Sequence, residues 1–143
     1  MPTRKASAVW EGDLKSGKGT FSGEGGAIGG SYSFSRFADQ SEGTNPEELL
    51  AAAEAACFSM ALSGGLGKNG TPPTRVETDA HCTVEKVGDG FKITTMKLTT
   101  RATVPGLDDA TFQRIASATK DGCPVSSALK GNVDIRLDAK LTA

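Results

Sequence analysis

The sequence predicts an α+β protein with a mostly antiparallel sheet and one long, buried central helix. Three observations predict this class. The middle of the chain carries a nearly continuous apolar helix pattern, alternating strand patterns lie on both sides of it, and the predicted order is strands, helix, hairpin, helices, strand. With 143 residues and no internal repeat, we expect a single domain over residues 1–143, which is long enough to bury a core.

The first part of the chain is rich in glycine and carries three short strand patterns, which are Ala6–Glu11, Thr20-Phe21 and Ser31–Phe37. In the third of these, Arg36 shares a face with Tyr32 and Phe34. A charged side chain on an aromatic face is costly unless it has a partner. Arg36 therefore either points inward to a partner or ends the strand and extends to water.

Residues 44–66 predict the central helix. Its start carries a capping residue, Thr44 or Asn45, followed by a proline and by two glutamates, Glu47 and Glu48, that complement the helix N-terminus. Either capping residue can form a capping-box pair with the glutamate three positions later. The glycines at positions 64, 65 and 67 are expected to end the helix.

This helix is apolar nearly all round, because Glu54 and Ser59 are its strongly polar residues between positions 49 and 62. Such a helix is expected inside a core. One sheet covers only one of its sides, so we expect a homodimer in which two sheets enclose the two central helices. The apolar run is too short to span a bilayer and includes Glu54.

Downstream, Arg75–Val87 alternates as a strand, with Cys82 on its core face and His81 on its solvent face. Both residues are therefore expected to be structural. A turn at Gly88–Gly90 leads into a partner strand. The alternation of that strand switches parity near residues 94–95, which indicates a bulge.

The last third of the chain predicts a second helix from a cap at Asp108 or Asp109 to Gly122. A short helical piece begins at Cys123. The final strand alternates over Val133–Leu141.

Composition excludes several classes of function. A net charge of −1 and a pI near 5.8 provide no basic surface for nucleic acid or anionic lipid. The N-terminal sequence lacks the apolar run of a signal peptide, so a cytoplasmic location is expected, where cysteines are normally reduced. Three cysteines and one histidine, without a CxxC motif, fit no standard zinc site.

Two cysteines can carry chemistry. Cys123 occupies the cap position of a helix, where backbone N–H groups and the helix dipole favour a thiolate, although it can equally be a residue that merely starts a helix. Cys57 lies on the buried helix, where a thiol is usually a small hydrophobic residue. A functional thiolate at Cys57 requires a nearby cation. Arg36 is the best inward-facing candidate, and Glu47 could orient it.

The run GTNPEELLAAAEAACFSMAL, with DGCPVSSAL downstream, resembles the osmotically inducible protein C / organic hydroperoxide resistance family. The segments YSFSRF and WEGDLKSGKGTFS resemble its osmotically inducible branch, and the match covers nearly the whole chain. The resemblance implies a thiol-dependent peroxidase built as an intertwined homodimer with active sites at the subunit interface. It also implies the site residues, with Cys57 as the peroxidatic cysteine, Cys123 as the resolving cysteine, Arg36 as the activating cation, and Glu47 (or Glu48) as the carboxylate that positions it.

The implied chemistry oxidises Cys57 to a sulfenic acid, which condenses with Cys123 to a disulfide that an external dithiol, of lipoyl type or another small one, reduces. It requires no metal, haem or flavin. Apolar side chains, with Phe34 and Phe58 as candidates, would favour organic hydroperoxides over hydrogen peroxide. Two alternatives remain open, a dimeric binding module for a small apolar ligand and a thiol redox sensor.

Overall fold

The computed structural model describes residues 2–34 and 43–142. Its internal contacts divide the chain into two compact units, Met1–Leu49 and Leu50–Ala143, and each is described here by itself. A single domain over residues 1–143 stays a prediction.

The first unit contains a three-stranded antiparallel sheet in the order β1–β2–β3. Its strands are β1 (Ala6–Glu11), β2 (Lys18–Gly23) and β3 (Gly29–Tyr32). The predicted bounds of β1 are confirmed. The ring of Tyr32 packs against those of Trp10 and Phe21, with centroids 5.5 and 6.0 Å away. Gly19 leaves room for them, because a Cβ there would lie 2.5 Å from the Tyr32 ring.

The prediction that the third strand runs on to Phe37 is wrong at Phe34, because β3 ends at Tyr32. Beyond Tyr32 the backbone pairs with the segment just before the next helix. The Thr44 N–H donates to the Ser31 carbonyl at 3.0 Å, and the Ser33 N–H donates to the Thr44 carbonyl at 3.4 Å. Arg36 lies outside the described residues, so its inward placement stays a prediction.

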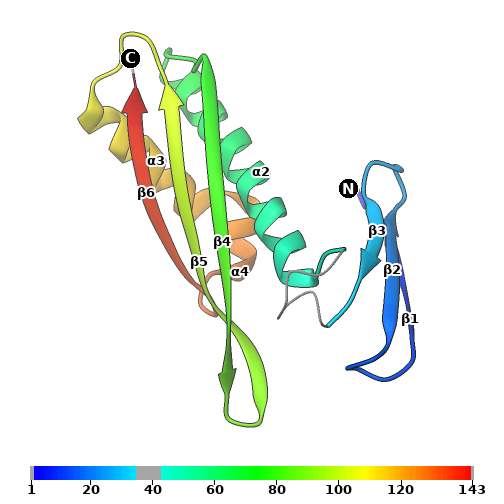
Figure 1. The fold of residues 1–143 in the computed structure, drawn as a ribbon. Coiled ribbons are helices and arrows are strands. Elements are labelled where there is room, and N and C mark those ends of the chain that lie inside the picture. The colour runs from blue at the N-terminus through cyan, green and yellow to red at the C-terminus, as the bar shows by residue number, and fades with distance from the viewer. Residues whose placement is uncertain (1, 35–42, 143) are drawn as a thin grey trace. The chain divides into compact units, whose positions relative to one another are not determined.

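In the second unit, β4 (Arg75–Val87), β5 (Gly90–Thr103) and β6 (Asp134–Thr142) form a mixed sheet in that order. The β4–β5 hairpin is antiparallel, as predicted, but β6 pairs with β5 in parallel. The expectation of a mostly antiparallel sheet is wrong for this pair. Helices between β5 and β6 return the chain to the end where β5 began, so β6 starts in the same direction (Figure 1).

Two finer predictions for this sheet are confirmed. Thr83 pairs with Thr95 and Val84 with Ile93, so the intervening residue of β5 is extra and forms the predicted bulge. Along β4 the side chain of His81 is exposed, as expected for the solvent face.

Helix α2 (Pro46–Lys68) buries one stripe of side chains within the described chain, which consists of Glu54, Phe58, Leu62 and Leu66. The opposite side is open, and Met60 is 73% exposed. Within the single chain, α2 is therefore not buried on all sides, because the sheet covers only one of its faces. With 23 residues, α2 is also long and apolar enough to cross a membrane, contrary to the expectation from the shorter run. The core helix of a soluble protein has the same properties.

The start of α2 follows its sequence signals. Asn45 caps the helix, because its Oδ1 accepts a hydrogen bond from the Glu48 N–H at 2.8 Å. The hydroxyl of Thr44 donates to the Glu48 carboxylate. Of the two capping pairs considered, the structure therefore contains the side-chain cap of Asn45 on Glu48.

The predicted end of α2 at its glycines is wrong, because residues 64–67 are helical. Gly65 allows close packing of helices, since a Cβ there would lie 3.1 Å from Cγ2 of Ile115. The helix ends in a Schellman motif, in which Gly70 has a φ of +83°. The N–H groups of Gly70 and Thr71 bond to carbonyls of the last helical turn.

Two further helices complete the second unit, α3 (Asp109–Gly122) and α4 (Pro124–Leu129). Asp108 caps α3 by accepting a hydrogen bond from the Thr111 N–H at 2.9 Å. In Figure 1, α2, α3 and α4 lie behind the β4–β5–β6 sheet. The core lies between these layers and comprises Phe58, Leu62, Leu66, Met96, Leu98, Ala102, Val104, Phe112, Ile115, Ala116 and Ala139.

Candidate functional site

The structure brings together the two cysteines that the sequence analysis singled out. The Cys123 thiol, at the start of α4, donates a hydrogen bond to Sγ of Cys57 on α2, with 2.9 Å between the sulfurs. Both are free thiols. Cys123 is 1% exposed, whereas Cys57 is only partly buried. The more accessible sulfur of the pair is therefore Cys57.

The backbone fixes Cys123 from both sides. Its N–H donates to the carbonyl of Thr119 at 2.9 Å and so closes the last turn of α3. Its own carbonyl accepts from the Ser127 N–H at 2.8 Å in the first turn of α4. These two bonds hold the backbone of Cys123 at the junction of α3 and α4, from which its side chain reaches Cys57.

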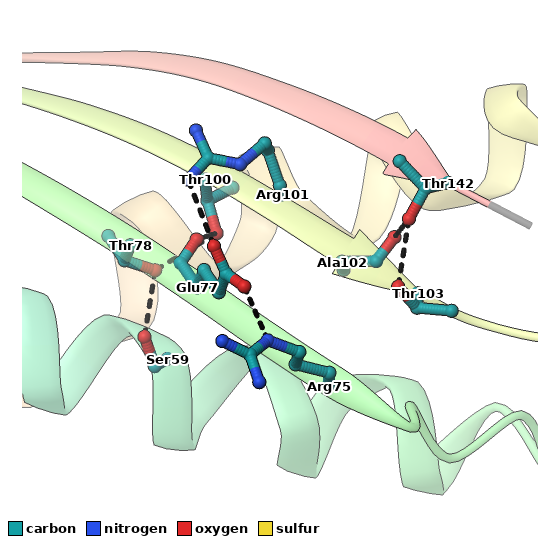
Figure 2. Close-up of polar contacts among 9 residues, drawn as sticks. All are labelled: Ser59, Arg75, Glu77, Thr78, Thr100, Arg101, Ala102, Thr103 and Thr142. Atoms are coloured by element: carbon teal, nitrogen blue, oxygen red, sulfur yellow. Dashed lines mark hydrogen bonds and ion pairs between the residues drawn. The ribbon is translucent and has the colours of Figure 1, made fainter.

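Cys57 is held through the anchoring of its helix to the sheet. Two residues after Cys57, the hydroxyl of Ser59 donates to Thr78 on β4 at 2.7 Å, and Thr78 shares a hydrogen bond of 2.9 Å with Thr100 on β5 (Figure 2). The Thr100 hydroxyl in turn donates to the Glu77 carbonyl at 3.0 Å. This chain of hydrogen bonds satisfies the three hydroxyls that form it and ties α2 to two strands.

On the other side of the same strand, the Glu77 carboxylate pairs with Arg75 and, at 3.0 Å, with Arg101 (Figure 2). These hydrogen bonds, that from Arg101 first, lower the pKa of Glu77. All three side chains are at least 40% exposed, so the pairs stabilise little and take no part in the thiol site.

The sequence analysis missed the role of Glu54 and did not single out Ser126. Glu54 lies one helical turn before Cys57 on α2 and is fully buried. The hydroxyl of Ser126, on α4, donates a hydrogen bond to Glu54 Oε1. A signal for Glu54 was present, since it is the charged residue in an otherwise apolar helix pattern. Nothing in the sequence pattern identified Ser126 as its partner.

The electrostatic surroundings of Cys57 act in both directions. Burial raises the pKa of the Cys57 thiol, and the hydrogen-bonded Cys123 raises it further. The N–H of Val125 on α4 donates to Cys57 and lowers its pKa, while the nearby charge of Glu54 raises it. The sequence analysis had assigned the backbone N–H groups at the start of α4 to Cys123, but the Val125 N–H serves Cys57.

The remaining predicted site residues are only partly placed. Glu47 lies half-buried in the first turn of α2, and Glu48 is exposed and bonded to Thr44. Arg36 lies outside the described residues, so its pairing with either glutamate stays a prediction. Phe58, a candidate for the substrate pocket, is fully buried in the core.

Cys82 does not belong to the thiol pair. It lies on β4, partly buried and packed against the core cluster, as its strand position predicted. Within residues 2–34 and 43–142, no three His, Cys, Asp or Glu side chains gather in a way that could hold a metal ion.

Comparisons with known proteins identify the family of the chain. The family model for OsmC-like proteins matches residues 38–138. The Peroxiredoxin OsmC of Escherichia coli (strain K12) is 48% identical over 139 residues, which are 96% of each chain. The Organic hydroperoxide resistance protein OhrB of Bacillus subtilis is 36% identical over 100 residues, or 68% of this chain and 71% of that protein.

Solved structures have the same fold. The crystal structure of OhrB from Bacillus subtilis matches with a TM-score of 0.72 and 28% identity, covering 95% of this chain and 98% of that one. An organic hydroperoxide resistance protein OsmC from Legionella pneumophila matches with a TM-score of 0.74 and 23% identity, covering 95% and 96%.

Proposed function

The chain belongs to the OsmC-like protein family, and we propose that it is a cysteine-based peroxidase that protects the cytoplasm by reducing organic hydroperoxides to alcohols. Hydrogen peroxide would be a poorer substrate. The observation that carries the proposal is the contact of 2.9 Å between Cys57 and Cys123. The names of its relatives, a peroxiredoxin and organic hydroperoxide resistance proteins, support the substrate class.

In the first step, the Cys57 thiolate attacks the terminal oxygen of the hydroperoxide. An S–O bond forms, the O–O bond breaks, and the leaving alkoxide takes a proton to become the alcohol. The sulfur loses two electrons and becomes a sulfenic acid. The partial exposure of Cys57 supports its assignment as the attacking residue, because Cys123 is almost fully buried.

In the second step, Cys123 attacks the oxidised sulfur. An S–S bond forms, the S–O bond breaks, and the hydroxide leaves as water with the proton of the Cys123 thiol. The short distance between the sulfurs supports a fast closure, because the pair begins close to bonding geometry. An external dithiol, of lipoyl type or another small one, then reduces the disulfide by thiol exchange.

The first step requires the thiolate, yet burial and Cys123 raise the pKa of Cys57. A cation has to oppose this effect. We propose Arg36 for this role, oriented by Glu47 or by Glu48. Arg36 would also stabilise the negative charge that develops on the leaving oxygen.

We further propose a homodimer with two active sites at the subunit interface. The face of α2 opposite the core supports it, because this face is open within the described chain and consists of Ala52, Ala53, Ala56, Met60, Ser63, Gly64 and Gly67. Small side chains allow two helices to approach closely. A partner subunit on this face would bury it.

The test is steady-state consumption of cumene hydroperoxide with dihydrolipoamide as reductant. Cys57→Ser should abolish turnover, whereas Cys82→Ser, the matched control, should retain it. If Cys57→Ser consumes the hydroperoxide as fast as the control, the peroxidase proposal is wrong and a binding module becomes the better account. If the wild type forms its disulfide but does not turn over with any dithiol, a redox sensor becomes the better account.

A further inference from the structure

We propose that the buried pair of Glu54 and Ser126 is a positioning pair for the resolving step, which holds the start of α4 so that Cys123 stays within reach of oxidised Cys57. The inference rests on the proposed function and deepens it. Neither residue touches the reacting atoms. Their effect would be exerted through the placement of Cys123.

The pair joins the same two elements as the thiols. Glu54 lies three residues before Cys57 on α2, and Ser126 lies three residues after Cys123 on α4. The Ser126 hydroxyl donates to Glu54 Oε1, and Glu54 and Ser126 are 0% and 1% exposed. The contact between the two sulfurs and this hydrogen bond therefore lie side by side along one helix–helix contact.

A buried carboxylate that joins two helices loses much of its hydration free energy. Apolar side chains of similar volume would pack there without the loss of hydration. Glu54 Oε2 is buried and has no hydrogen-bond partner among the described residues, which adds to this cost. A charge-assisted hydrogen bond is stronger and more directional than an apolar contact, and orientation is what a resolving cysteine requires.

The charge of Glu54 does not assist the first step. After burial and Cys123, it is a further cause that raises the pKa of Cys57 and so disfavours the attacking thiolate. If Glu54 assists the reaction, it therefore does so in the second step, in which Cys123 attacks oxidised Cys57. Among the described residues, the hydrogen bond from Ser126 joins the six-residue helix α4 to α2 through two buried side chains.

The resolving step depends on that position. The sulfurs are 2.9 Å apart in the reduced protein and must approach to about 2.05 Å as the S–S bond forms. Once Cys57 carries its sulfenic hydroxyl, an oxygen is added beside Cys123. The hydrogen bond between Ser126 and Glu54 would keep α4 in place while the added oxygen leaves as water.

The experiment compares Ser126→Ala with Ser127→Ala in the full-length protein. Ser127 is the matched control, because its hydroxyl is exposed and donates to the Asp121 carbonyl at 3.2 Å, outside the thiol site. The reduced proteins are mixed rapidly with one equivalent of cumene hydroperoxide and quenched at intervals with dimedone and acid. Intact mass then separates the sulfenic acid from the disulfide.

Ser126→Ala should form the sulfenic acid within about threefold of the wild-type rate but close the disulfide about tenfold more slowly, the effect of one lost charge-assisted hydrogen bond. With excess hydroperoxide, it should also accumulate Cys57 sulfinic acid. Ser127→Ala should match the wild type in both steps. Equal closure rates in the two variants, or a parallel slowing of both steps in Ser126→Ala, would overturn the proposal.

A second measurement does not depend on peroxidase activity. In a glutathione redox buffer, the equilibrium between reduced and disulfide forms gives the effective concentration of Cys123 at Cys57. Ser126→Ala should lower it about tenfold, whereas Glu54→Gln should lie between Ser126→Ala and the wild type, because its amide oxygen still accepts from Ser126 but carries no charge. If the wild type reacts with no hydroperoxide, the proposed function fails. If Ser126→Ala leaves this equilibrium unchanged, the positioning pair fails.

Discussion

Sγ of Cys57 and Sγ of Cys123 lie 2.9 Å apart, although 66 positions separate the two residues in the chain. One thiol comes from the middle of α2 and the other from the residue that joins α3 to α4. Both residues belong to the second unit, and backbone hydrogen bonds to Thr119 and Ser127 hold Cys123 at the junction of its two helices.

Removing the resolving thiol should trap the first oxidation product. In Cys123→Ser, the Cys57 sulfenic acid has no neighbouring thiol with which to condense, so it should persist and react with dimedone. Excess hydroperoxide should convert it to sulfinic acid, and turnover with a dithiol should fall by at least about tenfold. Mass spectrometry of the Cys57 peptide checks this. A Cys123→Ser protein that resists over-oxidation as well as the wild type would contradict the assignment.

The reactivity of Cys57 should depend on Arg36. Burial, and then Cys123, raise the pKa of the Cys57 thiol, and the proposed cation opposes both. Arg36→Met should therefore move the titration of Cys57 to higher pH. The rate of Cys57 alkylation as a function of pH, mapped by peptide mass, measures this shift. Arg75→Met, which removes an exposed arginine paired with Glu77, is the control and should leave the profile unchanged.

The same variant predicts a pH dependence of stability. In Arg36→Met the folded-state pKa of Cys57 should lie above that of the unfolded chain. The stability that the protonated Cys57 thiol contributes is then fully present below the ordinary thiol pKa. It is lost as the pH rises through the raised folded-state pKa of Cys57. Urea unfolding of the reduced protein at several alkaline pH values checks the sign. The prediction fails if Arg36→Met with an added Cys57→Ser substitution loses as much stability over this range.

Core packing beneath the thiols should dominate the stability of the second unit. Leu62 lies on α2 and is fully buried between the helix and the sheet. Leu62→Ala removes buried apolar surface and leaves a cavity, so it should lower the free energy of unfolding by about 2–5 kcal/mol. Ser117→Ala, at an exposed position of α3, should change it by less than about 0.5 kcal/mol. Denaturant unfolding of both variants gives the comparison.

The open face of α2 should be a subunit interface. Met60 is 73% exposed there, and a charge at its position would be buried without a partner in the proposed dimer. Met60→Asp should therefore shift the protein from dimer to monomer, whereas Lys68→Asp, at the exposed end of the helix, should leave it dimeric. Sedimentation equilibrium decides between these outcomes. A wild-type protein that sediments as a monomer would rule out the interface.

Sequence patterns predicted most elements of the second unit because their signals are local. The predicted bounds Arg75–Val87 are those of β4, and the parity switch located the bulge near residues 94–95. The parallel pairing of β6 was not predicted, because the direction of this strand depends on the end of the sheet to which α3 and α4 return the chain. The end of α2 was misplaced because several glycines can end a helix, and the one with positive φ is Gly70.

For the site, the residue types singled out Cys57 and Cys123 as thiols that can carry chemistry, and the family resemblance implied their pairing. The pattern could not show that Cys123 is buried or that the Val125 N–H bonds to Cys57, since both depend on how α4 packs. It also could not show what Glu54 contacts. A single charge in an apolar helix indicates a polar partner inside the fold, but the partner, Ser126, comes from an element 72 positions away.

The most direct test of the central claim is the intact mass and peptide map of the reduced wild-type protein after one equivalent of cumene hydroperoxide. The account predicts one intramolecular disulfide between Cys57 and Cys123, formed within seconds and reversed by a dithiol. Cys82 should stay free. If both thiols stay reduced, or if Cys82 is the residue that is oxidised, the thiol pair is not the reactive centre and the account is contradicted.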